Sequence, residues 1–307
     1  MKTEIRYRGL FAAAFTPMHE DGSLNLERIP SIVDYLVATQ AGGLYVCGTT
    51  GEGPSLSSDE RRAVAAAYVE AAAGRMPVIV QVGHNSLAES RELASHAESV
   101  GADAISAMPP TYFKVSSLKV LIDCLRHIAA AAPKLPLFYY HIPFMTGTDF
   151  DMVELLREGG EHLPSLAGIK YSDYTIHEYQ MCLQLENRRF DVLFGRDEML
   201  FSALCVGAAG AVGSTYNFAG PLYQRIIRAF EQGDLDEARR CQALSVDMIR
   251  ILLRYRGLPA FKATMKLIGL DCGPNRLPLE TLTPDEAKAL QEELDGIGFF
   301  DWALSSS

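Results

Sequence analysis

Residues 43–74 read GLYVCGTTGEGPSLSSDERRAVAAAYVEAAAG and contain one complete strand–turn–helix unit. The apolar run 43–47 predicts a buried strand, and the turn 48–52 follows it. Residues 57–60, SSDE, supply a helix cap and an acidic first turn, and an alanine-rich stretch then continues to Gly74. Serine at the start of a helix and glycine at its exit are the usual boundary signals. This stretch therefore predicts a strand whose following helix returns the chain.

The same alternation of apolar run and helical pattern repeats along the chain. The eight apolar runs cover residues 9–18, 43–47, 78–82, 104–108, 137–142, 166–170, 192–194 and 210–212. They are nearly continuous in apolar residues, which is typical of parallel strands buried on both faces. Eight strand–helix units predict an α/β protein, a (β/α)8 TIM barrel, in preference to an open doubly wound sheet. The first predicted strand is not followed by a G-x-G-x-x-G motif, so the sequence gives no support to dinucleotide binding.

The eighth unit ends near Gly233, and the rest of the chain has a helical pattern. We expect helices at residues 235–256, 260–268 and 284–294. No linker rich in proline or serine separates them from the preceding units. The sequence therefore predicts a barrel over residues 1–233 and a C-terminal helical extension of the same domain over residues 234–307.

The composition excludes several classes of partner. The chain has 307 residues and a formal charge of −10, which argues against nucleic acid because that partner requires a basic face. The six cysteines form no C-x-x-C pair, so we expect neither a metal site nor a disulfide framework. No apolar stretch approaches the ~20 residues that span a membrane. The N-terminus lacks the long apolar core of a signal peptide, so we expect no membrane partner and a cytoplasmic location.

The catalytic residues of such barrels come from the carboxyl ends of the strands. Lys170 ends the apolar run 166–170, so its ammonium is expected to point into the barrel mouth. Burial favours the neutral amine, and a neutral amine attacks a ketone to form a Schiff base. The alternative is a lysine that is ion-paired at a strand end.

Other polar groups follow neighbouring strands. Tyr140 is a candidate proton carrier or an aromatic that fills the barrel, whereas His141 should face the other way and pack. The turn 48–52 offers backbone N–H groups that can hold a carboxylate, although Gly/Thr turns are common. Asp197 and Glu198 can accept hydrogen bonds from a polyhydroxylated substrate. They also suit a helix N-terminus, and both interpretations can hold together.

Four motifs lie at strand ends in a fixed order: GTTGE at 48–52, YHIP at 140–143, GIK at 168–170 and GRDE at 195–198. Together they resemble the class I pyruvate-dependent aldolases, the family typified by N-acetylneuraminate lyase and dihydrodipicolinate synthase. The similarity runs from residue 9 through the C-terminal helices. It implies a (β/α)8 barrel with a helical extension, assembled as a homotetramer, that acts on small molecules without a metal or organic cofactor.

The resemblance also implies roles for single residues. In the family, the lysine of the sixth strand forms a Schiff base with the 2-keto carbon of pyruvate, and that position is Lys170. Tyr140 matches the tyrosine that shuttles protons. The turn that binds the pyruvate carboxylate corresponds to Thr49 and Thr50. Tyr112 matches a tyrosine that, in many members, joins a hydroxyl relay from a neighbouring subunit.

Within the family the lyase branch is the more similar one, above all over residues 195–217, GRDEMLFSALCVGAAGAVGSTYN. The residues implied to bind the sialic acid polyol chain are Asp197, Glu198, Ser214 and, through its backbone, Gly195. Ser172 stands where the lyases usually have a substrate-binding threonine. Met145 replaces the arginine with which the synthase recognises its second substrate. That replacement argues against the synthase.

The resemblance therefore predicts reversible cleavage of N-acetylneuraminate to N-acetylmannosamine and pyruvate. Two alternatives stay open. Another pyruvate-dependent aldolase or dehydratase that acts on a 2-keto-3-deoxy sugar acid would keep Lys170 and Tyr140 and differ in substrate. A non-catalytic pyruvate or sialic acid sensor is the reading without enzyme activity, and the intact set of Lys170, Tyr140 and Thr49 argues against it.

Overall fold

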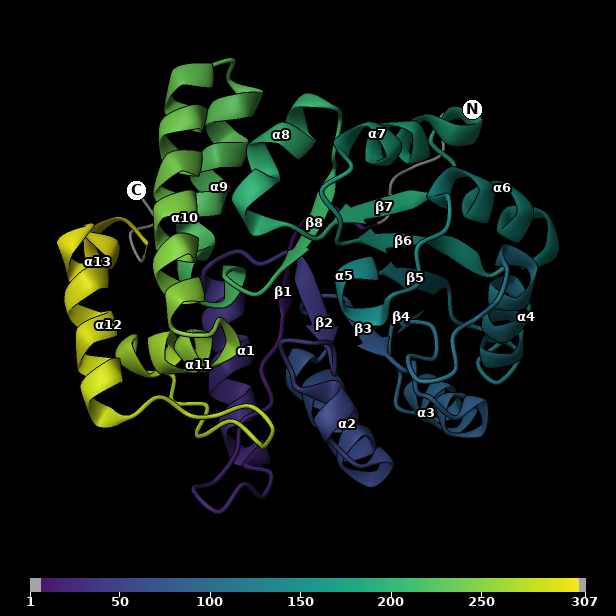
Figure 1. Cartoon of the computed structure of the whole chain (residues 1–307), viewed down its shortest axis with the longest axis horizontal. Helices are drawn as coiled ribbons and strands as arrows, with labels where there is room; N and C mark the ends of the chain where they lie inside the picture. The colour runs from purple at the N-terminus through teal and green to yellow at the C-terminus, as the bar shows by residue number, and fades with distance from the viewer. Residues whose placement is uncertain (1–6, 304–307) are drawn as a thin grey trace.

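The computed structural model describes residues 7–303, so residues 1–6 and 304–307, the outer ends of the two predicted segments, lie outside it. Eight parallel strands close into a barrel in sequence order, with β1 paired to β8 (Figure 1). The strands are β1 (Gly9–Ala13), β2 (Gly43–Val46), β3 (Val78–Gln81), β4 (Ala104–Ala107), β5 (Leu137–His141), β6 (Leu166–Tyr171), β7 (Asp191–Phe194) and β8 (Gly210–Gly213). The predicted TIM barrel is confirmed.

Helices alternate with the strands and surround the barrel (Figure 1). They are α1 (Ile29–Ala38), α2 (Ser58–Ala72), α3 (Leu87–Ser99), α4 (Leu118–Ala129), the short α5 (Pro143–Thr146), α6 (Met152–His162), α7 (Ile176–Gln184), α8 (Leu200–Cys205) and α9 (Tyr216–Glu231). Short 3-10 helices cover Leu26–Arg28, Gly53–Ser55, Leu185–Asn187 and Asp197–Met199. The last of these contains both acidic residues of the GRDE motif.

The predicted start of α2 has its physical basis in a reciprocal cap. The Ser57 side chain accepts a hydrogen bond from the Glu60 backbone N–H (3.2 Å), and the Glu60 carboxylate accepts one from the Ser57 N–H (2.9 Å). This capping box satisfies two N–H groups that the first helical turn leaves without partners. The strand β2 therefore passes into a helix after a turn of defined length, and that turn stays at the barrel mouth.

Side chains of the strands alternate between the barrel interior and the surrounding helices. The interior set includes Phe11, Tyr45, Phe138 and Tyr140. These large side chains fill the barrel, so a cavity can open only at an end of the strands. His141 faces outward as predicted, and its ring lies 5.0 Å from the Tyr171 ring, centroid to centroid.

The C-terminal extension consists of α10 (Leu235–Arg254), α11 (Leu258–Leu267), α12 (Pro284–Gly296) and α13 (Phe299–Trp302). It lies on one side of the barrel, with α10 against α9 and α12 and α13 outermost (Figure 1). The three predicted helices are present, and α13 is additional. The first of them ends at Arg254 because Arg256 takes a left-handed backbone conformation, with φ of 68°. The chain turns there and brings α11 towards the barrel mouth.

No helix within residues 7–303 combines the length and the apolar character that crossing a bilayer requires.

Candidate active site

A cavity of about 510 Å³ opens at the carboxyl ends of the strands. Its walls come from the turns after β2, β5, β6, β7 and β8 and from the joint between α10 and α11. The predicted site residues that line it are Thr49, Thr50, Tyr140, Lys170, Ser172, Gly195, Asp197, Glu198 and Ser214. Residues distant in the sequence thus meet at the end of the barrel where catalytic groups are found in this fold.

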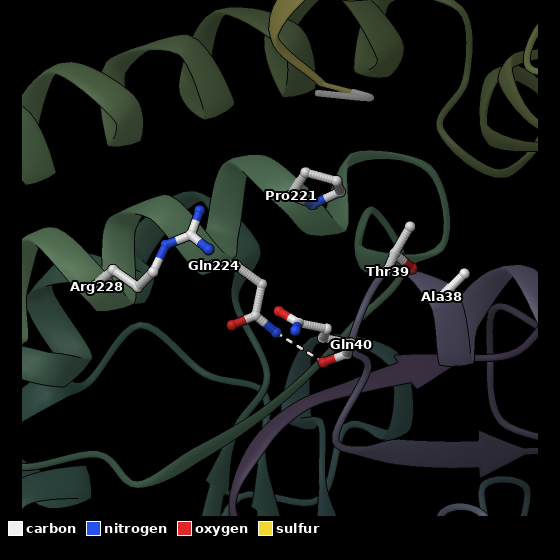
Figure 2. Close-up of a pocket in the computed structure, with 6 residues that line it drawn as sticks. All are labelled: Ala38, Thr39, Gln40, Pro221, Gln224 and Arg228. Carbon is white, nitrogen blue, oxygen red and sulfur yellow. Dashed lines mark hydrogen bonds between the residues drawn. The ribbon is translucent and has the colours of Figure 1, made fainter. Parts of the chain in front are cut away.

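A second cavity, of about 160 Å³, lies between the C-terminal end of α1 and α9 (Figure 2). Its lining is Ala38, Thr39, Gln40, Pro221, Gln224 and Arg228. The Gln224 side chain donates a hydrogen bond to the Gln40 carbonyl across it (2.8 Å). Arg228 is the one ionisable group in this lining, so the cavity has no acid–base pair. The mouth of the barrel is the candidate active site.

Lys170 lies on β6 and is 4% exposed. Its Nζ lies 3.9 Å from the centroid of the Tyr45 ring and 4.1 Å from that of the Tyr140 ring. Within residues 7–303 it forms no ion pair, which contradicts the alternative of a lysine paired at a strand end. Burial lowers the pKa of Lys170, and this effect is opposed by nearby Tyr140 and Asp197. The environment therefore favours the neutral, nucleophilic amine.

Two hydroxyl pairs connect the turn after β2 to the rest of the mouth. Thr49 Oγ1 and the Tyr140 hydroxyl are 3.2 Å apart, and Thr50 Oγ1 and Ser214 Oγ are 2.6 Å apart. Tyr140 is also the register partner of Lys170 on the neighbouring strand. The Lys170 amine, the Tyr140 phenol and the hydroxyls of the turn therefore lie together on the wall of one cavity.

The turn that carries these threonines is tightly folded. The Glu52 N–H donates to the Thr49 carbonyl (3.0 Å), and the Gly53 N–H donates to the Gly48 carbonyl (3.0 Å). A Cβ at Gly53 would lie 2.0 Å from the Cys47 carbonyl oxygen, so only glycine fits there. Glu52 itself adopts a left-handed conformation with φ of 53°. The GTTGE motif is thus a rigid turn that presents two hydroxyls to the cavity.

The carboxylates lie across the mouth from this turn. Asp197 is buried, and its Oδ2 accepts hydrogen bonds from the Thr215 N–H (2.8 Å) and hydroxyl (2.6 Å). Burial raises the pKa of Asp197 to about 6, although the hydrogen bonds from Thr215 lower it. Glu198 is half-buried, and its Oε1 lies 3.9 Å from Arg196 Nη1. Both acids begin a 3-10 helix and also line the cavity, so the two interpretations of the pair hold together.

Gly195 and Ser172 touch at the exits of β7 and β6. A Cβ on residue 195 would lie 2.0 Å from Ser172 Oγ, so a larger residue would displace this hydroxyl from the cavity wall. Ser172 is buried, and its N–H donates to the His141 carbonyl (2.8 Å). The pair therefore keeps a backbone segment and a hydroxyl at the cavity wall.

Tyr112 is the predicted site residue that the structure does not bring into the cavity. Its side chain is 78% exposed, and its ring contacts that of Phe113, with centroids 5.0 Å apart. The backbone at this point is held by Asn85, whose side chain accepts a hydrogen bond from the Tyr112 N–H (3.1 Å). Tyr112 is not among the residues that line the cavity of its own barrel, so within one chain it contributes nothing to that lining.

Sequence reasoning missed three groups at the mouth. Tyr45 contacts Lys170 through its ring and donates its hydroxyl to Ser106 Oγ (2.9 Å). Arg196 stacks on Tyr174 at 3.9 Å. The extension adds an outer wall of Ile249, Leu253, Arg256, Gly257, Leu258, Phe261 and Leu279. A period of two along β2 could have marked Tyr45 as inward-facing, but no local pattern predicts where the extension packs.

Among residues 7–303, no group of three or more His, Cys, Asp or Glu side chains is arranged to hold a metal ion. The functional groups of the mouth are instead an amine, phenols, hydroxyls, carboxylates and the guanidinium groups of Arg196 and Arg256. A buried amine beside a phenol at the mouth of a (β/α)8 barrel is an arrangement that can support covalent chemistry on a carbonyl group.

The chain belongs to the dihydrodipicolinate synthetase family, whose model matches residues 6–297. It is 46% identical to the N-acetylneuraminate lyase of Xenopus tropicalis over 278 residues, which cover 89% of this chain and 91% of the relative. The Proteus mirabilis N-acetylneuraminate lyase superposes with a TM-score of 0.93 at 39% identity, over 95% of this chain and 99% of that one. A catalytic lysine mutant of the Ruminococcus gnavus sialic acid aldolase gives a TM-score of 0.91 at 29% identity, over 97% and 98% of the two chains. The family predicted from the four motifs is confirmed.

Proposed function

We propose that this enzyme is a class I aldolase that reversibly cleaves N-acetylneuraminate to N-acetylmannosamine and pyruvate. The observation that carries the proposal is a buried Lys170 that forms no ion pair with any residue between 7 and 303, in contact with the Tyr140 ring and in the same cavity as a turn with two threonine hydroxyls. The relatives named N-acetylneuraminate lyase support the substrate. No metal or organic cofactor is required, because the covalent bond to the lysine supplies the electron sink.

The proposed reaction begins on the open-chain form of the substrate. The neutral Lys170 amine attacks the 2-keto carbon, and loss of water gives an iminium ion. Tyr140 takes up the proton of the C4 hydroxyl and passes its own phenolic proton to the carboxylate of the bound substrate as the C3–C4 bond breaks. The bonding electrons move to the iminium and give the enamine of pyruvate, while N-acetylmannosamine leaves as the aldehyde. Protonation at C3 and addition of water then release pyruvate and restore the lysine.

The pyruvate half of the substrate fits the turn after β2. We propose that Thr49 and Thr50 hold its carboxylate, with their hydroxyls and the neighbouring N–H groups as donors. The Thr49–Tyr140 pair then brings the bound carboxylate next to the proton carrier. In the same proposal, the polyol end of the substrate reaches Ser172, Asp197, Glu198 and Ser214 and the backbone of Gly195, all of which line the cavity.

Cleavage of different 2-keto-3-deoxy sugar acids tests the substrate assignment. We expect pyruvate release from N-acetylneuraminate and no condensation of pyruvate with aspartate semialdehyde, because Met145, which lines the cavity, stands at the position where the synthase has the arginine for its second carboxylate. Pyruvate release from short sugar acids at a rate above that from N-acetylneuraminate would favour the alternative aldolase. Absence of turnover on the whole panel would favour the sensor.

Glu198→Ala should lower kcat/KM for N-acetylneuraminate by about tenfold or more, because a hydrogen bond to an ionised acceptor contributes roughly 1.5–3 kcal/mol. Shorter sugar acids, which do not reach this carboxylate, should be affected far less. Asp197→Ala should act in the same direction and should also destabilise the fold, since Thr215 loses its acceptor. Equal losses on long and short substrates would make both carboxylates structural and withdraw their role in specificity.

The rate should also depend on pH through Asp197. The pKa of this buried carboxyl is raised to about 6, so the group is ionised above that pH and protonated below it. Only the ionised form accepts hydrogen bonds at both oxygens. We therefore expect kcat/KM, which reports the free enzyme, to fall as the pH drops through about 6. Asp197→Asn should remove this inflection at a lower overall activity, and an unchanged inflection in that variant would assign it to another group.

We further propose that the enzyme works in the cytoplasm as a homotetramer in which Tyr112 reaches the mouth of a neighbouring subunit. The exposure of Tyr112 and Phe113, two adjacent aromatic side chains, supports a contact at this surface. Light scattering that gives the mass of a single 33.7 kDa chain would contradict the assembly.

A further inference from the structure

One buried ion pair connects the carboxylate-binding turn to the C-terminal extension. Lys262 on α11 and Glu52, the last residue of the GTTGE turn, are 2.7 Å apart between Nζ and Oε1. Their side chains are 3% and 0% exposed. In every other ion pair between residues 7 and 303, at least one partner is more than a fifth exposed. Glu52 does not line the cavity, so neither charge has a part in the mechanism described above.

The pair is held by further hydrogen bonds within the extension. Glu52 Oε1 accepts from the Asn275 side chain (3.1 Å), and Glu52 Oε2 accepts from the Arg276 N–H (2.9 Å). The Lys262 ammonium also donates to the Pro274 carbonyl (2.7 Å). Because removing ions from water is costly, a buried pair of this kind is weak evidence for stability. Its directional hydrogen bonds instead fix the position of the turn against the extension.

The turn transmits that position to the site over a short, stiff path. Glu52 is three residues from Thr49, and its N–H donates to the Thr49 carbonyl (3.0 Å). On its other side, Gly53 is packed so closely against Cys47 that a Cβ on it would lie 2.0 Å from the Cys47 carbonyl oxygen, which leaves the backbone little room. A displacement of the Glu52 carboxylate therefore moves the two threonine hydroxyls relative to Tyr140 and Lys170.

We propose that Lys262 is a positioning residue of the active site: through Glu52 it holds Thr49 and Thr50 where the carboxylate of the substrate binds. The inference rests on the proposed function, because it concerns the carboxylate that the turn receives. It also explains why the extension reaches the barrel mouth at α11. In this proposal the C-terminal extension has two roles at the site. It forms the outer wall of the cavity, and through Lys262 it positions the turn that binds the pyruvate half of the substrate.

Lys262→Met tests the proposal, because it removes the ammonium and keeps most of the apolar stem. We expect the pyruvate concentration that half-saturates borohydride trapping on Lys170 to rise about 10- to 100-fold, the effect of a misplacement of about 1 Å. The trapping rate at saturating pyruvate should stay within about threefold, since Lys170 lies on its own strand. The matched control is Lys266→Met, one turn along α11, which removes an exposed ion pair with Asp271 (3.1 Å) and should leave both values unchanged.

A second variant keeps the test decisive if Lys262→Met does not fold, because that change leaves a buried carboxylate without its counter-ion. Lys262→Met combined with Glu52→Gln removes both charges of the pair. The glutamine side chain still has one oxygen that can accept a hydrogen bond. We expect this double variant to fold and to show the same rise in half-saturating pyruvate, since the two residues act as one unit. Normal half-saturation in the folded variants, or an equal rise in Lys266→Met, would overturn the positioning role. A wild-type enzyme that traps no pyruvate would overturn the proposed function itself.

Discussion

Lys170→Arg should abolish pyruvate release from N-acetylneuraminate, with a loss in kcat of more than about 10⁴-fold, the scale on which covalent nucleophiles contribute. The guanidinium stays charged in proteins, so it cannot attack the keto group. In the wild-type enzyme burial lowers the pKa of Lys170, and in the proposed mechanism the neutral amine attacks the keto group. Borohydride added with pyruvate should therefore inactivate the wild type irreversibly, and mass spectrometry should find the adduct on Lys170.

Two controls separate this result from a general loss of structure. Lys266→Arg changes an exposed lysine outside the cavity and should leave turnover and trapping unchanged. The thermal midpoint of Lys170→Arg should show that the variant is folded, because the faces of the Tyr45 and Tyr140 rings, which lie beside Lys170 Nζ, can stabilise a guanidinium cation. An adduct on any other lysine, or loss of activity on treatment with a chelator, would contradict the mechanism.

The eight strands were predictable from sequence because parallel barrel strands are buried on both faces and read as continuous apolar runs. The first run shows the limit of that signal. Residues 9–18 are apolar except for Thr16, yet β1 ends at Ala13. Beyond it, Met18 is buried through its contact with the extension, where its N–H donates to the Cys272 carbonyl (3.0 Å). An apolar run therefore indicates that the residues are buried. It does not distinguish residues of a barrel strand from residues that a distant segment covers.

The site was predictable where it depends on strand ends and was not where it depends on packing between distant segments. Lys170 and Tyr140 occupy positions that strand register alone brings together. Lys262 and Glu52 are separated by more than 200 residues, and no local pattern predicts their contact. The sequence places Tyr45 only within the apolar run 43–47. Its contact with the Lys170 amine, which lies 3.9 Å from the ring centroid, follows only from the closed barrel.

For Asp197, the structure adds detail to the role that the sequence predicted. Its position at a strand end predicted an acceptor for substrate hydroxyls, and it does line the cavity. One of its oxygens is already occupied by both donors of Thr215, so a single oxygen is left for the substrate. Glu198 forms only a long contact with Arg196 and keeps more of its acceptor capacity. We therefore expect Glu198 to be the cleaner determinant of specificity, with Asp197 acting in part through the order of the β8 turn.

Tyr140→Phe should lower kcat by roughly 10²–10⁴-fold, the range that general acid–base groups contribute. The ring is retained, so the contact of Lys170 Nζ with the ring (4.1 Å from its centroid) and the packing against Tyr45 survive. Thr49 loses a hydrogen bond to the hydroxyl, which is worth about 1 kcal/mol and should change KM by no more than about fivefold. Steady-state cleavage of N-acetylneuraminate measures both constants. Schiff-base trapping with pyruvate should persist, because it needs Lys170 and not the proton carrier.

Tyr139→Phe is the matched control, since it makes the same chemical change one residue earlier on β5. Tyr139 is buried but faces away from the cavity, and its hydroxyl forms no hydrogen bond with any residue between 7 and 303. Its removal should therefore leave kcat near the wild-type value. Near-normal turnover in Tyr140→Phe would assign the proton transfer to another group. The remaining neighbours are the Thr49 hydroxyl and the substrate carboxylate. Equal losses in both tyrosine variants would instead reduce Tyr140 to an aromatic that fills the barrel, the interpretation that its sequence position alone also allowed.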